Sequence, residues 1–248
     1  MAFESKTYTR LAQYYDLIYA DKDYEKESEF LKYIFTKYSK NKVTSILDVA
    51  CGTGNHAKTF KKDYFVIGID ASKDMVDIAK SKVGDVDFFV ENMKDFKLDR
   101  SFDAVVCLFN SFSYNLTDEE ALSSLKNFAG HLEKNGVIAF DVMVENMPTT
   151  EIHTGVKDDL DIARISKWSK KDKETTQVEL VYMTRNKNKV DFHVDNHTLR
   201  VYGIHHLKKL MKKAGFGKIR VYNGFERKQY QKGSVSALFV GVKKGKWF

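Results

Sequence analysis

The sequence contains little cysteine and no long hydrophobic run. Its 248 residues include two cysteines, Cys51 and Cys107, which cannot build the disulfide framework of a small secreted domain, and no Cys/His spacing resembles a zinc site. No apolar run approaches the ~18 residues that a membrane-spanning helix needs, and the first residues lack the apolar segment of a signal peptide. We therefore expect a cytoplasmic protein that binds no metal and no membrane.

The composition is that of an ordinary globular protein, with 43% hydrophobic residues, 30% charged residues and a formal net charge of +7. The charge is uneven, because residues 151–248 hold 22 Lys and Arg against 10 Asp and Glu. Such a basic region can attract an anionic substrate or RNA. A solvated, lysine-rich surface is the simpler interpretation, since charge alone does not identify a partner.

Short aliphatic runs alternate with helical patterns through the first 142 residues. The expected strands are residues 45–49, 65–70, 86–90, 104–109 and 137–142. The expected helices are residues 8–19 and 24–38 before them, and 56–62, 72–81 and 117–132 between them. Thr117 followed by Glu120 predicts a capping box at the start of the last helix. Buried strands that alternate with helices predict an α/β fold, a Rossmann-like and mostly parallel sheet with helices on both faces.

The pattern changes after about residue 143. Residues 161–169, 176–184 and 190–199 are expected to form longer strands, with RNKNK (Arg185–Lys189) as a hairpin turn between the last two. We therefore divide the chain into a core, residues 1–142 and 200–248, and a small antiparallel insertion, residues 143–199. In the last part of the core we expect a helix at residues 204–214 and strands at 218–223 and 237–242.

The stretch ILDVACGTGN, residues 46–55, combines an aliphatic run, an acidic residue and a glycine-rich turn. In an open parallel sheet, ligands bind beyond the carboxyl ends of the strands. Gly52 and Gly54 let a ligand press against the backbone, and the helix that follows offers N–H groups to an anion. Asp70, at the end of the second run, can accept both hydroxyls of a ribose. We expect the cofactor to bind here.

Two cofactors fit such a turn. Gly52-x-Gly54-x-x-Ala57 satisfies the dinucleotide pattern G-x-G-x-x-G/A, which would indicate a nicotinamide-dependent oxidoreductase. Asp48 argues against it, because its carboxylate would repel a pyrophosphate. S-adenosylmethionine has a cationic amino group and a sulfonium, both of which suit Asp48. A tight turn that holds no ligand is the third interpretation.

Four stretches resemble the cofactor motifs of class I S-adenosylmethionine-dependent methyltransferases. They are DVACGTG (Asp48–Gly54), GIDASKDMVDIAK (Gly68–Lys80), FFVENMKDF (Phe88–Phe96) and FDAVVCLFNSFSY (Phe102–Tyr114). In the third, Asn92 takes the place of the family's acidic residue that accepts the adenine amino group. The resemblance implies the class I methyltransferase fold and S-adenosylmethionine as cofactor. It implies cofactor contacts from Tyr15, Asp48, Ala50, Gly52, Gly54, Asp70, Ala71, Met75, Asn92, Met93, Leu108, Phe109 and Asn110.

The chain further resembles N,N-dimethyltransferases that act on amino groups of nucleotide-linked sugars. The resemblance is carried by residues 14–27, 107–114 and 197–216, and these enzymes also insert an antiparallel sheet after the fifth strand. Two substrate-side segments differ. The family's Glu-Pro-Trp-Trp-Phe-Pro is DVMVENMP here (Asp141–Pro148), and its Arg-Gly-Leu-Phe is VSALF (Val235–Phe239). Small-molecule N-methyltransferases, including glycine-type ones, share the remaining features, so an amino sugar and an amino acid both stay open as acceptors.

Methyl transfer to an amine requires in-line attack by the neutral amine and a group that takes its proton. The residues proposed for catalysis are Tyr15, Tyr114, Asp141 and His197. Each has an alternative: core packing for the two tyrosines, a solvated acid for Asp141 and pairing within its own sheet for His197. In the resembled family the N-terminal helix covers the cofactor, which implies a second role for Tyr15 as part of a lid.

The sequence therefore predicts an S-adenosylmethionine-dependent methyltransferase for a small-molecule amine, either a monomer or a homodimer. The alternatives are an RNA methyltransferase of the same fold, an NAD-dependent oxidoreductase and a non-catalytic protein that binds S-adenosylmethionine. RNA is not the favoured partner, because we find no separate RNA-binding module and no surface of interleaved aromatic and basic residues.

Overall fold

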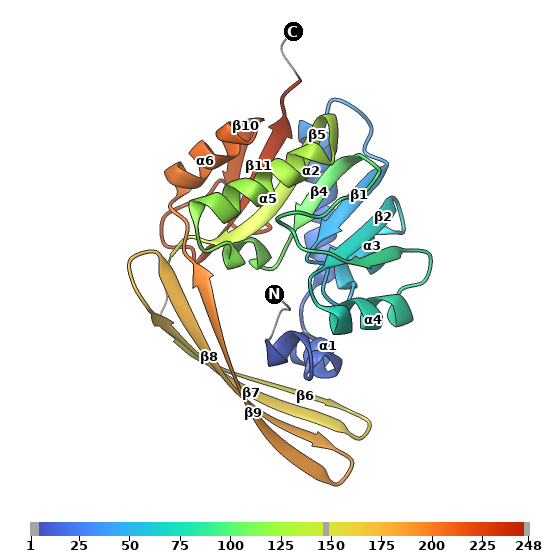
Figure 1. Cartoon of the computed structure of the whole chain (residues 1–248), viewed down its shortest axis with the longest axis vertical. Coiled ribbons are helices and arrows are strands. Elements are labelled where there is room, and N and C mark those ends of the chain that lie inside the picture. Colours follow the sequence, from blue (N-terminus) through green and yellow to red (C-terminus); the bar gives the residue numbers. More distant parts are fainter. Residues whose placement is uncertain (1–4, 146–148, 246–248) are drawn as a thin grey trace.

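The computed structural model describes residues 5–145 and 149–245, which form two β-sheets (Figure 1). The larger sheet has the strand order β10-β11-β5-β4-β1-β2-β3. The pairs among β1 to β5 are parallel, and β11 is antiparallel to both β5 and β10. The strands are β1 (Ser45–Val49), β2 (Phe65–Asp70), β3 (Asp87–Val90), β4 (Phe102–Cys107), β5 (Leu132–Met143), β10 (Phe216–Tyr222) and β11 (Ser236–Lys243). This confirms the predicted α/β fold with a mostly parallel sheet.

Helices cover both faces of the larger sheet, as predicted. One face packs against α2 (Tyr24–Tyr38), α3 (Asn55–Phe60) and α4 (Lys73–Lys82), and the other against α5 (Asp118–Gly130) and α6 (Ile204–Lys213). Side chains cap several helix starts by accepting a backbone N–H three residues on. Asp23, Ser72 and Thr117 do so for α2, α4 and α5. The predicted capping interaction of Thr117 is thus confirmed.

The smaller sheet is antiparallel, with the order β6-β7-β8-β9. Its strands are β6 (Thr149–Lys157), β7 (Leu160–Lys170), β8 (Thr175–Asn186) and β9 (Lys189–Arg200). The sequence predicts the last three and their hairpin, but it misses β6, because that strand is mostly exposed and lacks apolar alternation. Residues 146–148, at the end of the substrate-side segment Asp141–Pro148, lie outside the described residues.

Residues 5–19, here called the N-terminal segment, lie between the two sheets (Figure 1). Leu11 and Ile18 pack in a core with apolar side chains of the smaller sheet, and the Ser72 hydroxyl donates to the Tyr8 carbonyl at the larger sheet. The prediction of one helix over residues 8–19 is wrong, because the backbone leaves the helical region at Thr9 (φ −117°, ψ −99°). Short helices form instead: η1 (Lys6–Tyr8), η2 (Ala12–Tyr14) and α1 (Tyr15–Ile18).

Candidate active site

The turn after β1 presents backbone to the space beyond the sheet. Ala50, Gly52 and Gly54 have positive φ angles of 57°, 55° and 78°. A Cβ built at Gly52 would meet no heavy atom within 4 Å, whereas one at Gly54 would lie 3.1 Å from the Phe88 ring. Gly52 is therefore the open position of the turn, and Gly54 serves its close packing.

A first cavity, of about 200 Å³, adjoins this turn. The predicted cofactor residues that line it are Tyr15, Ala50, Gly52, Asp70, Ala71, Met75, Asn92, Met93 and Phe109. Asn110 lines a second cavity instead, and Leu108 is buried in the core. Residues that line the first cavity without having been predicted as cofactor contacts are Tyr8, Glu91, Lys94, Ser111, Tyr114 and Asn115.

Asp70 is fixed by the turn beside it. Its Oδ2 accepts the Gly52 N–H at 2.9 Å, and its Oδ1 accepts the Ser72 N–H at 2.9 Å. Burial raises the pKa of Asp70, and these backbone N–H groups oppose the shift. Each carboxylate oxygen has a second lone pair, so Asp70 is positioned to accept the hydroxyls of a ribose.

Asp48 lies within β1, two residues before Ala50, which lines the first cavity. It is 2% exposed, and its Oδ2 has no hydrogen-bond partner among the described residues. Burial, reinforced by the negative charge of Asp70, raises the pKa of Asp48 to about 8. A buried carboxyl with an unpartnered oxygen favours a nearby cation. This fits the amino group of S-adenosylmethionine and would oppose a pyrophosphate.

The lip after β4 carries local backbone strain. Phe109 and Asn110 have positive φ angles of 62° and 57°, which non-glycine residues rarely adopt. The Asn110 N–H donates to Asp141 Oδ2 at 2.9 Å, and its side-chain oxygen accepts the Ser236 hydroxyl at 3.0 Å. Asp141 is 4% exposed, and burial raises its pKa to about 7. The structure thus places Asp141 behind the lip, where it orients Asn110 rather than lining either cavity.

A second cavity, of about 580 Å³, lies between the N-terminal segment, the lip and the inner face of the smaller sheet. Tyr8, Tyr15, Phe109 and Tyr114 line both cavities, so the two meet at these aromatic side chains. The smaller sheet contributes Glu151, His153, Arg164, Ser166, Trp168, Val178, Leu180, His197 and Leu199. A molecule in the second cavity would therefore face a cofactor in the first.

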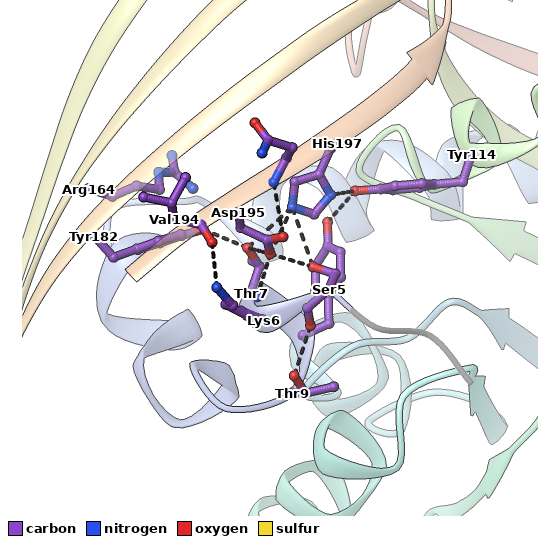
Figure 2. Close-up of polar contacts among 12 residues, drawn as sticks. Ser5, Lys6, Thr7, Thr9, Tyr114, Arg164, Tyr182, Val194, Asp195 and His197 are labelled. Atoms are coloured by element: carbon purple, nitrogen blue, oxygen red, sulfur yellow. Dashed lines mark hydrogen bonds and ion pairs between the residues drawn. The ribbon is translucent and has the colours of Figure 1, made fainter. Parts of the chain in front are cut away.

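Two predicted catalytic residues meet at this junction (Figure 2). The Tyr114 hydroxyl lies 2.6 Å from His197 Nδ1, and His197 Nε2 lies 3.3 Å from Asp195 Oδ2. The same oxygen accepts the Thr7 N–H at 2.8 Å and the Ser5 hydroxyl at 2.7 Å. Burial opposes ionisation, but the hydrogen bonds from His197, Thr7 and Ser5 hold the pKa of Asp195 well below its usual range. An anionic Asp195 favours a proton on His197 Nε2, which leaves Nδ1 to accept from Tyr114.

Tyr15 lies among aromatic rings at the same junction. Its ring centroid is 4.8 Å from that of Tyr19 and 6.2 Å from that of Tyr8. The Tyr8 hydroxyl in turn bonds the Tyr114 hydroxyl at 2.8 Å. Burial, together with the neighbouring tyrosines, raises the pKa of Tyr15 well above 10, so its phenol stays protonated. The position and protonation of Tyr15 fit a lid over the first cavity better than a group that accepts the proton of the amine.

Asp195 is the residue of this network that the sequence analysis misses. It precedes His197 by two positions in a strand, so both side chains lie on one face. That spacing was available in the sequence. Its partners Ser5 and Thr7 are 190 and 188 residues away, and no local pattern predicts their approach.

Comparison with known proteins agrees with the fold. Residues 46–136 match the model of a methyltransferase domain. The chain is 37% identical to dTDP-3-amino-3,4,6-trideoxy-alpha-D-glucopyranose N,N-dimethyltransferase of Streptomyces venezuelae over 133 residues, 52% of this chain and 56% of that protein. It is 30% identical to an uncharacterized methyltransferase of Oceanobacillus iheyensis over 180 residues, 70% of this chain and 81% of that protein. The crystal structure of Streptomyces venezuelae DesVI superposes with a TM-score of 0.83 at 27% identity, covering 94% of this chain and 98% of that one.

A mostly parallel sheet with this strand order, an open glycine turn and an acidic residue at the end of β2 define a Rossmann-like enzyme of the class I methyltransferases. The chain belongs to the S-adenosylmethionine-dependent methyltransferases. Within them it is related to the sugar N,N-dimethyltransferases at moderate identity.

Residues 5–145 and 149–245 contain no group of three or more His, Cys, Asp or Glu side chains arranged to hold a metal ion. In the same part of the chain, no helix is long and apolar enough to cross a membrane.

We expect the affinity for S-adenosylhomocysteine, which keeps the cationic amino group, to rise with pH between pH 6 and pH 8. Asp48 has a raised pKa of about 8, so below that pH it must lose a proton before it can pair with the amino group. The α-amino group of the ligand belongs to a free amino acid and stays cationic through this range, so the titration of Asp48 determines the change. Calorimetry at several pH values, in buffers of different ionisation enthalpy, measures both the affinity and the released proton. Asp48→Asn should remove the proton release, and a wild-type affinity that is constant from pH 6 to 8 would contradict the role of Asp48.

Asp70→Ala is expected to weaken binding of S-adenosylhomocysteine by ~1–3 kcal/mol, because hydrogen bonds to the ribose hydroxyls are lost. The bond from Gly52 N–H is lost as well, which loosens the turn. Asp70→Asn is the matched control, since one acceptor oxygen remains, and its affinity should lie between those of the wild type and the alanine variant. Calorimetry at fixed pH measures all three, and an unchanged dissociation constant in Asp70→Ala would refute the ribose contact.

Proposed function

We propose that the chain transfers the methyl group of S-adenosylmethionine to the amine of a small molecule of amino-sugar or amino-acid type. The observation that carries the proposal is the Tyr114–His197–Asp195 chain at the junction of the two cavities. The relative from Streptomyces venezuelae, named as an amino-sugar N,N-dimethyltransferase, supports an amine as the acceptor. We further propose that residues 143–199 form the substrate-side insertion on a core of residues 1–142 and 200–248.

An amine reaches the site as an ammonium ion and must lose a proton before it can react. Burial and the adjacent Tyr8 raise the pKa of Tyr114 well above 10, so Tyr114 is no standing phenolate. It acts as a relay, accepting the amine proton while its own proton moves to His197 Nδ1. Asp195 then stabilises the imidazolium cation at its Nε2 side.

S-adenosylmethionine supplies an activated methyl group on a positively charged sulfur. Held by the Gly52 turn and Asp70 in the first cavity, it would present this methyl group to the lone pair of an amine that the second cavity aligns. Tyr15 and Phe109 line both cavities and would exclude water from the junction. Alignment and proton removal are thus the tasks of this chain's own residues.

Methyl transfer from labelled S-adenosylmethionine tests the proposal, with amino sugars, amino acids, a bulk RNA and hydroxyl compounds as acceptors. We expect transfer to one of the amines and none to RNA. Transfer to RNA alone would replace the proposal by the RNA alternative, and binding of S-adenosylhomocysteine without turnover of any acceptor would favour a non-catalytic binding protein. Calorimetry with NAD(H) completes the set, because tight NAD(H) binding would indicate an oxidoreductase.

A further inference from the structure

The second cavity contains a buried cation without an acidic partner. Arg164, on β7, is 5% exposed, and no carboxylate forms an ion pair with it among the described residues. Its terminal nitrogens donate to the Tyr19 hydroxyl at 2.6 Å and to His153 Nδ1 at 2.9 Å, and its Nε has no partner. Burying a guanidinium among neutral groups is unfavourable unless an anion compensates it. The arrangement is that of a cation prepared for a ligand.

The neighbours of Arg164 add hydrogen-bond donors rather than negative charge. Trp168 lines the same cavity, and its indole N–H has no acceptor within residues 5–145 and 149–245. Burial and the charge of Arg164 lower the pKa of His153, so this histidine stays neutral and accepts from the guanidinium. Ser166, between Arg164 and Trp168 on the same face of β7, adds a hydroxyl.

The other charged groups of the cavity differ from Arg164. Lys22 also lines it, but its ammonium pairs with Glu27 and lies 4.7 Å from the Phe109 ring centroid. The two acids of the lining are Asp21 and Glu151, and both are exposed. They provide no buried counter-ion for Arg164, so the uncompensated charge of the cavity is positive at its β7 wall.

Arg164 is connected through Tyr19 to the junction of the two cavities. It donates to Tyr19, whose ring packs 4.8 Å from both Tyr15 and Phe109, two of the residues that line both cavities. His197, on the same sheet face, carries the proton relay. A small molecule in the cavity can therefore present its amine to Tyr114 while another of its groups reaches Arg164.

From these contacts we infer that the methyl acceptor is an amine that also carries an oxyanion, a carboxylate or a phosphate, which Arg164 binds with the help of Trp168. This inference rests on the proposed function, because it identifies the second cavity as the acceptor site. Arg164 is then the residue that selects amines carrying an oxyanion over amines without one. A planar guanidinium suits both anions, since each offers two oxygens to its N–H fork.

Matched probe pairs test the inference on the S-adenosylhomocysteine complex of the full chain. The pairs are glucosamine 6-phosphate with glucosamine, and glycine with glycinamide. We expect at least one member that carries the anion to bind ~10-fold or more tightly than its partner without the anion, and Arg164→Gln to abolish that preference. Whichever pair shows the larger preference assigns the anion as phosphate or carboxylate. Equal binding within both pairs, or no saturable binding by either glucosamine 6-phosphate or glycine, would overturn the inference.

Two control variants keep the result specific. Arg185→Gln removes an arginine of the same sheet that is already paired with Asp161, and it should keep the preference. Arg164→Lys retains the charge without the fork and should keep part of it. A preference that survives in Arg164→Gln would also overturn the inference. Methyl transfer to the same probes separates the two claims: a charged-probe preference without turnover leaves Arg164 as an anion site and removes the proposed amine methylation.

Discussion

Replacing Gly52 with valine should reduce the affinity for S-adenosylhomocysteine roughly 100-fold or more, ~2.7 kcal/mol. Two effects combine. A β-branched residue is strained at the Gly52 φ of 55°. The new side chain would also enter the first cavity, because a Cβ at this position meets no protein atom within 4 Å. Calorimetric titration of S-adenosylhomocysteine measures the loss.

Gly224→Val is the matched control for backbone strain. Gly224 has the same φ of 55°, and a Cβ built there also meets nothing within 4 Å, but the residue is outside the lining of both cavities. Both variants should lose similar stability in thermal unfolding, while only Gly52→Val loses the cofactor. An unchanged dissociation constant in Gly52→Val would show that the first cavity does not hold the cofactor.

Tyr114→Phe should lower kcat for the amine by ~10²–10⁴-fold at neutral pH and leave the affinity for S-adenosylhomocysteine within a few-fold. The phenylalanine ring keeps the packing at the junction but cannot pass a proton to His197. Because free amine becomes more abundant at high pH, the rate of the variant should rise more steeply with pH than that of the wild type. Steady-state kinetics from pH 6.5 to 9.5 measure both effects.

His197→Gln should reproduce this profile, and the double variant should be little slower than either single one, because both act on one proton. Tyr182→Phe is the control. Its hydroxyl bonds Thr7 in the same buried cluster at 2.7 Å, but it lines neither described cavity. A normal kcat in Tyr114→Phe, or an equally slow Tyr182→Phe, would leave the relay without support.

The parts of the site that follow one another in sequence could be predicted. The turn at Gly52 and the acid at Asp70 end neighbouring parallel strands, and parallel strands bring their carboxyl ends to one edge. The run Ser45–Val49 contains three aliphatic residues and is buried at all five positions, which is typical of a central strand covered on both faces. The cofactor half of the site can therefore be predicted from local sequence together with a simple rule of sheet geometry.

The acceptor half depends on contacts that no local pattern contains. Arg164 meets Tyr19 across 145 residues, and Asp195 meets Ser5 across 190. Both pairings require the smaller sheet to fold over the N-terminal segment. An exposed strand such as β6 has no hydrophobic periodicity from which this arrangement could be predicted. Asp141 illustrates the converse, since the sequence analysis proposed it for catalysis, whereas its carboxylate accepts the backbone N–H of Asn110.

The position of the N-terminal segment also determines the order in which a growing chain can complete its site. Thr7 is synthesised 188 residues before Asp195, its partner on β9. At ~5–20 residues per second, the ribosome needs roughly 10–40 s to make that stretch. β1 to β5, with the glycine turn, emerge within this interval, whereas the wall that carries His197 emerges near its end. The nascent protein therefore acquires the framework for its methyl donor well before it can enclose anything to be methylated.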